Sequence, residues 1–274
     1  MSRLSFSSAL IAMLLASACG GGGGSGEPLA PANCDYTQCA SLSGHSYVVY
    51  EPAALPANAP MLLLLHGANT GLSYTESMWQ GRAFADRYGY RLVIPQGKGD
   101  VWNYGSDVQF VADLIDTVQR ERGTSAAVFI AGWSNGSALS QIFACDHAGK
   151  IAGVVSLAGP LLSSHACQPT RPVAVALMAG SNDSVVPVST GAFGSMGMSE
   201  AFAVWERLMA CSGPREIVSD NTLMPGSRST TTRAGACAAP VQQTLMDGAG
   251  HAPNWVHAVL HERLQDFFLR AQAR

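Results

Sequence analysis

The stretch AAVFIAGWSNGSA, residues 126–138, decides the fold that this sequence predicts. An apolar run ends at Ala131, a turn follows, and the residues after the turn have helical spacing. Ser134 lies in that turn, with one glycine two positions before it and another two positions after it. This arrangement fits the nucleophile-elbow pattern, in which a strained turn between strand and helix exposes the serine oxygen. Side chains at Gly132 and Gly136 would collide with the neighbouring strand and helix, so both positions require glycine.

Predicted strands and helices alternate along the rest of the chain. Apolar runs predict strands at 46–50, 61–65, 91–94, 126–131, 151–157, 173–178 and 241–246. Helical spacing predicts helices at 76–88, 107–122, 201–209 and 255–270, besides the one that follows Ser134. The alternation indicates a mainly parallel, doubly wound α/β sheet flanked by helices. No Gly/Pro-rich linker or repeat divides residues 30–274, so we expect one domain there.

The composition fits a globular protein and disfavours several partners. Apolar residues make up 47% of the 274 residues and charged residues 13%, which is enough apolar material for a substantial core. A formal net charge of −3 favours neither nucleic acid nor an anionic membrane surface as a partner. After the N-terminal segment, no apolar run is long enough to span a bilayer.

The first 29 residues predict export. Arg3, a short apolar run and small residues are typical of a secretory signal peptide, here residues 1–18. Residues 15–19 resemble a bacterial lipoprotein cleavage box, by which Cys19 would become the lipidated first residue and residues 19–29 a Gly-rich tether. An ordinary signal peptide cut near Ala18 is the alternative. We therefore expect a protein that is secreted or lipid-anchored in the bacterial cell envelope and that contacts a membrane only through its anchor.

Six cysteines remain once Cys19 is set aside, and an even number in an exported chain suggests disulfides. Many connectivities are possible for six cysteines, and spacing alone does not choose among them. The simplest hypothesis joins each cysteine to its neighbour along the chain, as Cys34–Cys39, Cys145–Cys167 and Cys211–Cys237. No Cys-x-x-Cys pair and no histidine at zinc-finger spacing occurs, so we expect no structural metal.

Two loops elsewhere supply partners for Ser134. A serine hydroxyl needs a base to take its proton, and that base, usually histidine, needs a carboxylate to orient it. In doubly wound sheets, ligands bind beyond the carboxyl ends of the strands. Asp183 is the only acid in the loop after Met178, and His251 lies in the loop after Met246. Because the order serine, acid, histidine also matches the elbow pattern, we predict a catalytic triad of Ser134, Asp183 and His251.

Acyl transfer also requires hydrogen-bond donors for the oxyanion. We expect them from the main-chain amides of Asn135, directly after the serine, and of Ala68, in the loop after the strand at 61–65.

The other acid and histidine side chains that could replace a triad member have simpler interpretations. Asp247 is expected to cap a turn, and His66 to be a hydrogen-bonded structural residue. Four other histidines are expected on the surface: His147, His165, His257 and His261. A metal site formed by His257 and His261, which are spaced i, i+4, is the less favoured alternative for that pair.

Several motifs together carry a resemblance to a known family. They are 60–67 (PMLLLLHG), 93–97 (VIPQG), 102–103 (WN), 107–111 (DVQFV), 132–136 (GWSNG), 180–187 (GSNDSVVP) and 248–251 (GAGH). With them the chain resembles the secreted esterases grouped with polyhydroxybutyrate depolymerases and bacterial feruloyl or acetylxylan esterases. The resemblance implies an α/β-hydrolase fold for the catalytic domain 30–274, the triad named above, and no metal or organic cofactor. It also supports the pairs Cys145–Cys167 and Cys211–Cys237.

The substrate is less determined than the fold. Many of these relatives have Thr-Trp-Pro directly after the histidine, where this chain has APNW at 252–255. The candidates for an aromatic substrate-binding face are Trp102, Tyr104, Trp133 and Trp255, although packing of the last helix explains Trp255 equally well. The loop 189–198 contains three glycines and two methionines, so we expect it to be adaptable and to border the substrate groove.

These observations predict a secreted serine esterase that acts through an acyl-enzyme. The expected substrate is a polyester oligomer or an aromatic or acetyl ester of a polysaccharide. Two alternatives share the same sequence features: an acyltransferase that uses the triad on a cell-envelope acceptor, and a non-catalytic surface-binding lipoprotein that kept the fold. The complete triad argues against the second alternative, and the sequence leaves the oligomeric state open.

Overall fold

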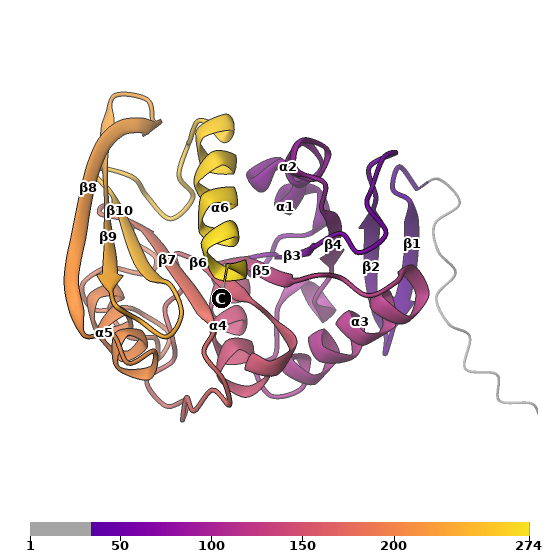
Figure 1. Ribbon diagram of the computed structural model, residues 1–274, viewed down its shortest axis with the longest axis horizontal. Helices are drawn as coiled ribbons and strands as arrows, with labels where there is room; N and C mark the ends of the chain where they lie inside the picture. The colour runs from indigo at the N-terminus through magenta and orange to yellow at the C-terminus, as the bar shows by residue number, and fades with distance from the viewer. Residues whose placement is uncertain (1–33, 274) are drawn as a thin grey trace, which may run out of the picture.

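A ten-stranded sheet runs through residues 34–273, the part of the chain that the computed structural model describes (Figure 1). The strand order is β1-β2-β4-β3-β5-β6-β7-β10-β9-β8. The central strands from β4 to β10 are parallel, and antiparallel strands extend the sheet at both edges. None of the helices in this part of the chain is both long and apolar enough to cross a membrane. The expected signal peptide (1–18), the lipidation of Cys19 and the tether (19–29) lie outside the described residues.

The predicted strands are present, and three further strands join them. The bounds are β1 Gln38–Leu42, β2 His45–Tyr50, β3 Met61–Leu65, β4 Arg91–Pro95, β5 Val128–Trp133, β6 Gly153–Leu157, β7 Ala174–Gly180, β8 Gly213–Met224, β9 Ser227–Gly235 and β10 Val241–Met246. The predictions coincide with β3 and β10 and overlap β2, β4, β5, β6 and β7. The sequence pattern does not predict β1, β8 or β9. The mainly parallel sheet flanked by helices is therefore confirmed, with a longer antiparallel extension than expected.

Helices cover both faces of this sheet (Figure 1). They are α1 Leu72–Trp79, α2 Gly81–Tyr88, α3 Asp107–Arg122, α4 Asn135–Asp146, α5 Met198–Leu208 and α6 His257–Gln272, with short 3₁₀ turns at Lys98–Asp100 and Ala148–Lys150. Helices α1, α2 and α6 pack on one face, and α3, α4 and α5 pack on the other. Both core clusters are needed because a parallel sheet is apolar on each face.

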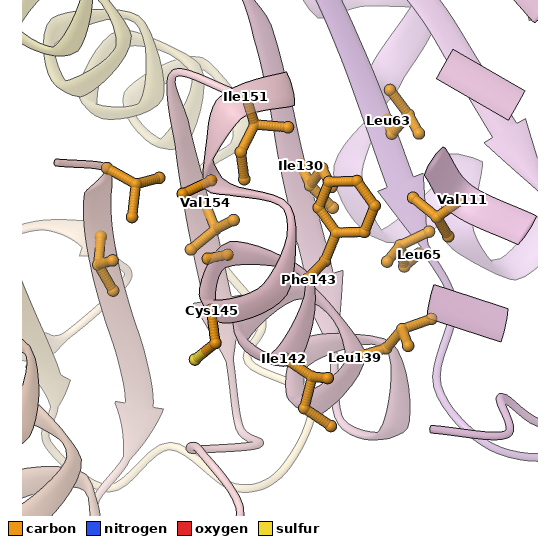
Figure 2. Packing of buried hydrophobic residues seen from close by; sticks show 14 of the residues in the cluster. Leu63, Leu65, Val111, Ile130, Leu139, Ile142, Phe143, Cys145, Ile151 and Val154 are labelled. Atoms are coloured by element: carbon orange, nitrogen blue, oxygen red, sulfur yellow. The ribbon is translucent and has the colours of Figure 1, made fainter. Parts of the chain in front are cut away.

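Strand β3 shows how one strand serves both cores. Successive side chains of a strand point to opposite faces, so Leu62 and Leu64 join the cluster under α6. Leu63 and Leu65 join the cluster under α3 and α4 instead. Figure 2 shows this second cluster, in which Val111 and Phe143 pack with them. All four leucines are fully buried, which explains why 61–65 is an uninterrupted apolar run rather than an alternating one.

The single helix predicted at 76–88 is wrong, because the chain forms two helices there. Gln80 ends α1 and precedes α2 in the left-handed conformation, with φ 46° and ψ 52°. A left-handed residue cannot continue a right-handed helix, so the chain changes direction at this point. Gly81 then approaches the sheet so closely that a Cβ there would lie 2.7 Å from Leu64 Cδ1. Helical spacing does not report such a break, since neither residue interrupts the apolar pattern.

Three disulfides join the cysteines in the pairs expected from the sequence: Cys34–Cys39, Cys145–Cys167 and Cys211–Cys237. The second ties the last turn of α4 to the segment between β6 and β7. The third ties the segment after α5 to the segment before β10. Each cross-link restricts the unfolded chain and so favours the folded state.

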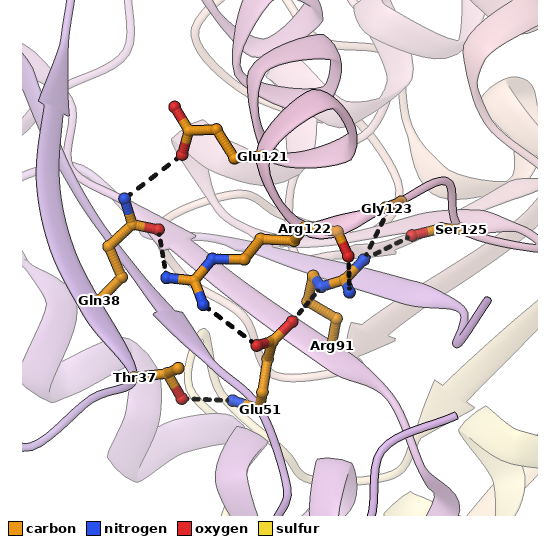
Figure 3. Close-up of polar contacts among 8 residues, drawn as sticks. All are labelled: Thr37, Gln38, Glu51, Arg91, Glu121, Arg122, Gly123 and Ser125. Atoms are coloured by element: carbon orange, nitrogen blue, oxygen red, sulfur yellow. Dashed lines mark hydrogen bonds and ion pairs between the residues drawn. The ribbon is translucent and has the colours of Figure 1, made fainter. Parts of the chain in front are cut away.

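A buried arginine ties the parallel core to the helix beside it (Figure 3). Arg91, the first residue of β4, has a side chain that is 3% exposed. Its Nε donates to Glu51 Oε1 at 2.6 Å, and its Nη2 donates to the carbonyl of Arg122 at 2.7 Å. Its Nη1 donates to the carbonyl of Gly123 at 3.1 Å and to Ser125 Oγ at 3.3 Å. The guanidinium therefore satisfies the carbonyls at the end of α3 together with a carboxylate.

We expect Arg91→Ala to lower the free energy of unfolding by about 3–5 kcal/mol, because it leaves two partly buried carbonyls without their donor and removes one of the two arginines that pair with the Glu51 carboxylate. Urea denaturation under non-reducing conditions measures this effect. Arg87→Ala is the matched control, since the Arg87 pair with Glu262 is exposed on both sides and an exposed pair contributes at most about 1 kcal/mol. Equal decreases in the free energy of unfolding of the two variants would show that the buried contacts of Arg91 contribute no more to stability than an exposed ion pair.

Candidate active site

Ser134 occupies the turn between β5 and α4. Its backbone has φ 54° and ψ −116°, a conformation that residues other than glycine rarely adopt. The Ser134 amide donates to the carbonyl of Leu157 on β6 at 2.8 Å, and the Ala138 amide donates to the Ser134 carbonyl at 3.1 Å. The next strand and the first turn of α4 therefore hold the serine in this strained conformation.

The two flanking glycines allow the turn to form. A Cβ at Gly136 would lie 2.5 Å from the carbonyl oxygens of Leu65 and His66, at the end of β3. A Cβ at Gly132 would overlap the carbonyl of Gly136 itself. The expected collisions with strand and helix are therefore present, at Gly136 with the end of β3 and at Gly132 with the start of α4.

The imidazole of His251 lies between the hydroxyl of Ser134 and the carboxylate of Asp183. His251 Nε2 is 2.8 Å from Ser134 Oγ, and His251 Nδ1 is 2.8 Å from Asp183 Oδ2. With Nδ1–H donating to the carboxylate, Nε2 presents its lone pair to the serine hydroxyl. The three residues come from loops after β5, β7 and β10, at the carboxyl ends of parallel strands. The structure thus brings together the residues proposed as a triad, 117 and 68 positions apart along the chain.

The second oxygen of Asp183 is also fully engaged. Asp183 Oδ1 accepts hydrogen bonds from the amides of Val185 and Val186, each at 2.9 Å. The side chain has no exposed surface. Because two fixed amides hold Oδ1, the other oxygen can point only at His251. This arrangement fixes the orientation of the carboxylate.

Contacts between the loops hold the imidazole in place. The Asn182 amide donates to the carbonyl of Ala249 at 2.9 Å, and the Gly248 amide donates to Ser181 Oγ at 2.8 Å. Trp133 Nε1 donates to the carbonyl of His251 at 2.8 Å, and the two rings lie 5.3 Å apart. The last residue of β5 therefore positions the histidine loop as well as leading into the serine turn.

A pocket of about 460 Å³ opens in front of the serine. Apart from His251, no titratable side chain except the Tyr104 phenol lines it within the described residues, and apolar groups make up most of the wall. The lining residues are Ala68, Asn69, Tyr104, Trp133, Ser134, Asn135, Ala138, Gly159, Leu162, Val185, Val186, Ala192, Phe193, Ser195 and His251. Phe193 is 83% exposed at the mouth, which places an aromatic side chain within reach of a bound molecule. The loop 189–198 does border this groove, as expected.

Of the four aromatic candidates, two line the pocket and two do not. Trp133 and Tyr104 line it. Trp102 is 4% exposed and donates from Nε1 to the carbonyl of His66, so its predicted place in the pocket is wrong. Trp255 is 5% exposed, lies against Trp79 and donates to a carbonyl at the end of α1, so it packs the last helix instead. The sequence pattern does not single out Val185, Val186, Leu162 or Phe193, since isolated apolar residues in loops carry no periodicity.

The two residues whose amides are expected to bind an oxyanion belong to different segments of this pocket. Ala68 and Asn135 both line it, together with Ser134. Asn135 is the first residue of α4, so its amide has no partner within the helix. Among residues 34–273, the Ala68 amide makes no hydrogen bond, whereas the next amide, of Asn69, donates to the carbonyl of Asp100. Two unpaired donors therefore remain beside the serine.

Two of the other histidines, His66 and His261, make buried hydrogen bonds within the fold. His66 Nδ1 donates to the carbonyl of Gly67, and His66 Nε2 accepts from the amide of Gly97, each at 2.8 Å. Burial lowers the pKa of His66, which keeps the ring neutral for this pair of bonds. His261 is wrongly expected on the surface: it is 4% exposed, bonds the carbonyl of Trp79, and burial lowers its pKa too. No cluster of potential metal ligands occurs within residues 34–273.

Comparison with known proteins identifies relatives of this fold and sequence. Residues 103–203 match the phospholipase/carboxylesterase family. The bifunctional acetylxylan esterase/xylanase XynS20E of Neocallimastix patriciarum is 30% identical over 149 residues, which cover 53% of this chain and 22% of that protein. Feruloyl esterase B of Piromyces equi is 25% identical over 219 residues, covering 71% of this chain and 40% of that protein. The chain thus spans less than half the length of these two relatives.

A third sequence relative and a solved structure agree with these matches. Poly(3-hydroxyalkanoate) depolymerase C of Paucimonas lemoignei is 23% identical over 124 residues, which cover 39% of this chain and 30% of that protein. The acetyl xylan esterase of Aspergillus awamori superposes with a TM-score of 0.66 at 15% identity, covering 81% of this chain and 94% of the other. The chain therefore has the α/β-hydrolase fold and is similar in sequence to acetylxylan esterases, feruloyl esterases and polyhydroxyalkanoate depolymerases.

Proposed function

We propose that this protein is a serine esterase that hydrolyses carboxylic esters through an acyl-enzyme. The observation that carries the proposal is the His251 ring, 2.8 Å from the Ser134 hydroxyl on one side and 2.8 Å from the Asp183 carboxylate on the other. This geometry matches that of a nucleophile, a general base and the group that orients the base. The names of the sequence relatives support the ester as the bond that is cleaved.

Each group has a role in the proposed reaction. Ser134 Oγ attacks the ester carbonyl as His251 Nε2 removes its proton, and Asp183 stabilises the imidazolium that results. The amides of Ala68 and Asn135 donate to the oxyanion of the tetrahedral intermediate. His251 then gives the proton to the departing alcohol, which leaves the acyl group on Ser134. A water molecule, activated by the same histidine, releases the acid and restores the serine.

The pocket favours esters with a neutral acyl group. Its wall is mainly apolar and aromatic and carries no lysine or arginine among the described residues, so a carboxylate on the acyl chain would lose its hydration without gaining a partner. A polyester oligomer, an aromatic ester or an acetyl ester of a polysaccharide satisfies this condition. We place this activity in a single catalytic domain, residues 30–274.

The proposed location is outside the cytoplasm. The described disulfides support export, because such bonds persist in oxidising compartments. Residues 1–18 as a signal peptide, Cys19 as a lipid attachment site and 19–29 as a tether complete the proposal, from sequence alone. Metabolic labelling with a fatty-acid probe, compared between wild type and Cys19→Ser, would separate anchoring from simple secretion.

The direct test of the proposed function uses the wild-type protein without its signal peptide. We expect it to release p-nitrophenol from p-nitrophenyl acetate or butyrate, and to react with a fluorophosphonate probe at a peptide that contains Ser134. Failure to react with either reagent would contradict the proposal and favour a binding protein that kept the fold. Addition of acceptor alcohols during ester cleavage separates hydrolysis from acyl transfer, because only transfer makes a new ester the main product.

A further inference from the structure

The loop between β4 and α3 contacts both segments that are proposed to hold the oxyanion. We call residues 96–104 the bracket loop. It is outside the triad and contributes only Tyr104 to the pocket lining. Its remaining side chains and amides contact the segment 66–70 on one side and Asn135 on the other, so the loop spans the gap between the Ala68 and Asn135 amides.

Four hydrogen bonds join the bracket loop to the segment that contains Ala68. Trp102 Nε1 donates to the carbonyl of His66 at 2.9 Å, and the Gly97 amide donates to His66 Nε2 at 2.8 Å. The Asn69 amide donates to the carbonyl of Asp100 at 2.8 Å, and Gln96 Nε2 donates to the carbonyl of Thr70 at 3.2 Å. Ala68 therefore lies between residues that are fixed on both sides, while its own amide remains unpaired.

On the other side, the bracket loop is joined to the elbow through one side chain. Asn135 Oδ1 accepts from the Trp102 amide at 2.6 Å, and Asn135 Nδ2 donates to the Trp102 carbonyl at 3.3 Å. The same Nδ2 donates to the Tyr104 hydroxyl at 2.7 Å. The carboxamide thus pairs with both polar groups of one peptide residue, much as a neighbouring strand would. Its main-chain amide, only a few bonds away, is one of the two unpaired donors.

Trp102 connects the two sides. Its indole is bonded to His66, its backbone is bonded to Asn135, and its ring stacks 6.5 Å from Phe110 in the core under α3. The ring also lies 4.6 Å from the His66 imidazole, and the residue is 4% exposed. A buried, doubly bonded side chain of this size has little freedom to move, so it fixes the distance between its two partners.

We infer that the carboxamide of Asn135 is a positioning group that, through Trp102, sets the spacing between the Ala68 and Asn135 amides. The inference rests on the proposed esterase function. Oxyanion donors act only when they lie 2.7–3.1 Å from the developing charge, and about 1 Å of misplacement can cost about 100-fold in rate. Helix α4 orients the Asn135 amide relative to Ser134, and Gly136 packs against the carbonyls of Leu65 and His66. Among the described residues, however, no hydrogen bond joins α4 directly to the segment 66–70.

A purely structural role for Asn135 makes a different prediction. If the carboxamide only stabilised the start of α4, its loss would lower the melting temperature and the fraction of active protein. The affinities for an inhibitor that forms an oxyanion and for a neutral ketone would then fall by the same factor. A positioning role weakens the transition state selectively, so kcat falls while KM changes little.

The experiment compares Asn135→Ala with wild type on p-nitrophenyl butyrate, with rates corrected for titrated active sites. We expect kcat to fall about 10- to 100-fold and KM to stay within about twofold. A trifluoromethyl ketone, which forms an oxyanion on Ser134, should lose the same factor in affinity, whereas the matching methyl ketone should lose much less. Gln109→Ala is the control, since it removes an amide of similar size that bonds only Asp113 on an exposed face of α3.

A second variant approaches the link from the opposite side. Trp102→Phe keeps an aromatic ring in the core and the backbone bonds to Asn135, but removes the donor to His66. We expect the same selective loss of kcat, several-fold rather than 100-fold. Combined with Asn135→Ala, the losses should be less than multiplicative, because both changes break one connection.

The possible outcomes distinguish failure of the positioning role from failure of the proposed esterase function. The positioning role alone is overturned if the wild-type protein hydrolyses esters and the Asn135→Ala variant has an unchanged kcat. It is also overturned if the variant loses affinity equally for the trifluoromethyl ketone and the methyl ketone. Fully multiplicative losses in the double variant overturn the connection through Trp102. Wild type that neither hydrolyses esters nor labels at Ser134 overturns the esterase proposal, and the positioning role with it.

Discussion

Ser134→Ala should lower kcat for a p-nitrophenyl ester about 10⁶-fold while leaving the fold unchanged. The substitution removes one oxygen, which bonds only His251, so no buried polar group besides the imidazole loses a partner. The pocket, the proposed oxyanion donors and the Asp183–His251 pair all remain. Without a nucleophile no acyl-enzyme can form, and the remaining rate reflects only attack by water at a site still able to bind the ester.

The measurement needs a control for the substitution itself. Ser184→Ala makes the same chemical change in the exposed acid loop, one residue from Asp183, and should keep wild-type kcat and KM. The melting temperatures of both variants should match that of wild type within a few degrees. A Ser134→Ala protein that kept more than about one-hundredth of wild-type activity would leave the reaction without the nucleophile we propose.

Asp183→Asn should cost about 10⁴-fold in kcat, for a reason that the hydrogen bonds of Asp183 make specific. Two fixed amides, of Val185 and Val186, donate to Oδ1, so an asparagine there must keep its oxygen at that position. Its NH₂ group then faces His251 Nδ1 as a donor. The imidazole must accept that bond and carry its proton on Nε2 instead, which prevents it from taking the proton of Ser134.

Asp247→Asn is the matched control, because Asp247 is the other acid near the histidine in the sequence. Its carboxylate pairs with Arg228 on the surface, so we expect activity within about twofold of wild type. Steady-state kinetics of both variants decide between the two acids. Similar losses in the two, or a larger loss for Asp247→Asn, would show that Asp183 does not orient the base.

Periodicity was enough to predict the elements that lie against the core. The helix at 107–122 and the strand at 241–246 have the bounds expected. Buried apolar residues recur through the helix as far as Val118, with Gly123 at its end, and the strand has a buried apolar residue at each end. The hairpin of β8 and β9 carries no such signal. Most of β8 is exposed and rich in polar residues, so neither alternation nor an apolar run marks it. The pairing of β9 with the edge of β10, and of β8 with β9, is a tertiary effect that no local pattern contains.

Loop position predicted the proposed triad better than composition predicted the pocket. Ser134, Asp183 and His251 each follow a predicted strand, and the carboxyl ends of parallel strands meet at one edge of the sheet. The same reasoning placed Trp102 and Trp255 in the pocket, and this prediction is wrong for both, because a tryptophan near the site can equally be buried behind it. Whether such a ring faces solvent or core depends on the path of the loop, which the residues alone do not specify.

The positive φ of Ser134 means that selection for stability and selection for activity favour different residues at this position. A serine at 54° carries on the order of 1–3 kcal/mol of unfavourable conformational energy, which glycine would not carry. A library selected only for heat resistance would therefore enrich Ser134→Gly, a change that helps the fold and removes the hydroxyl. Selection for thermal stability must therefore assay turnover in every round, because one substitution that relieves backbone strain also removes the proposed nucleophile.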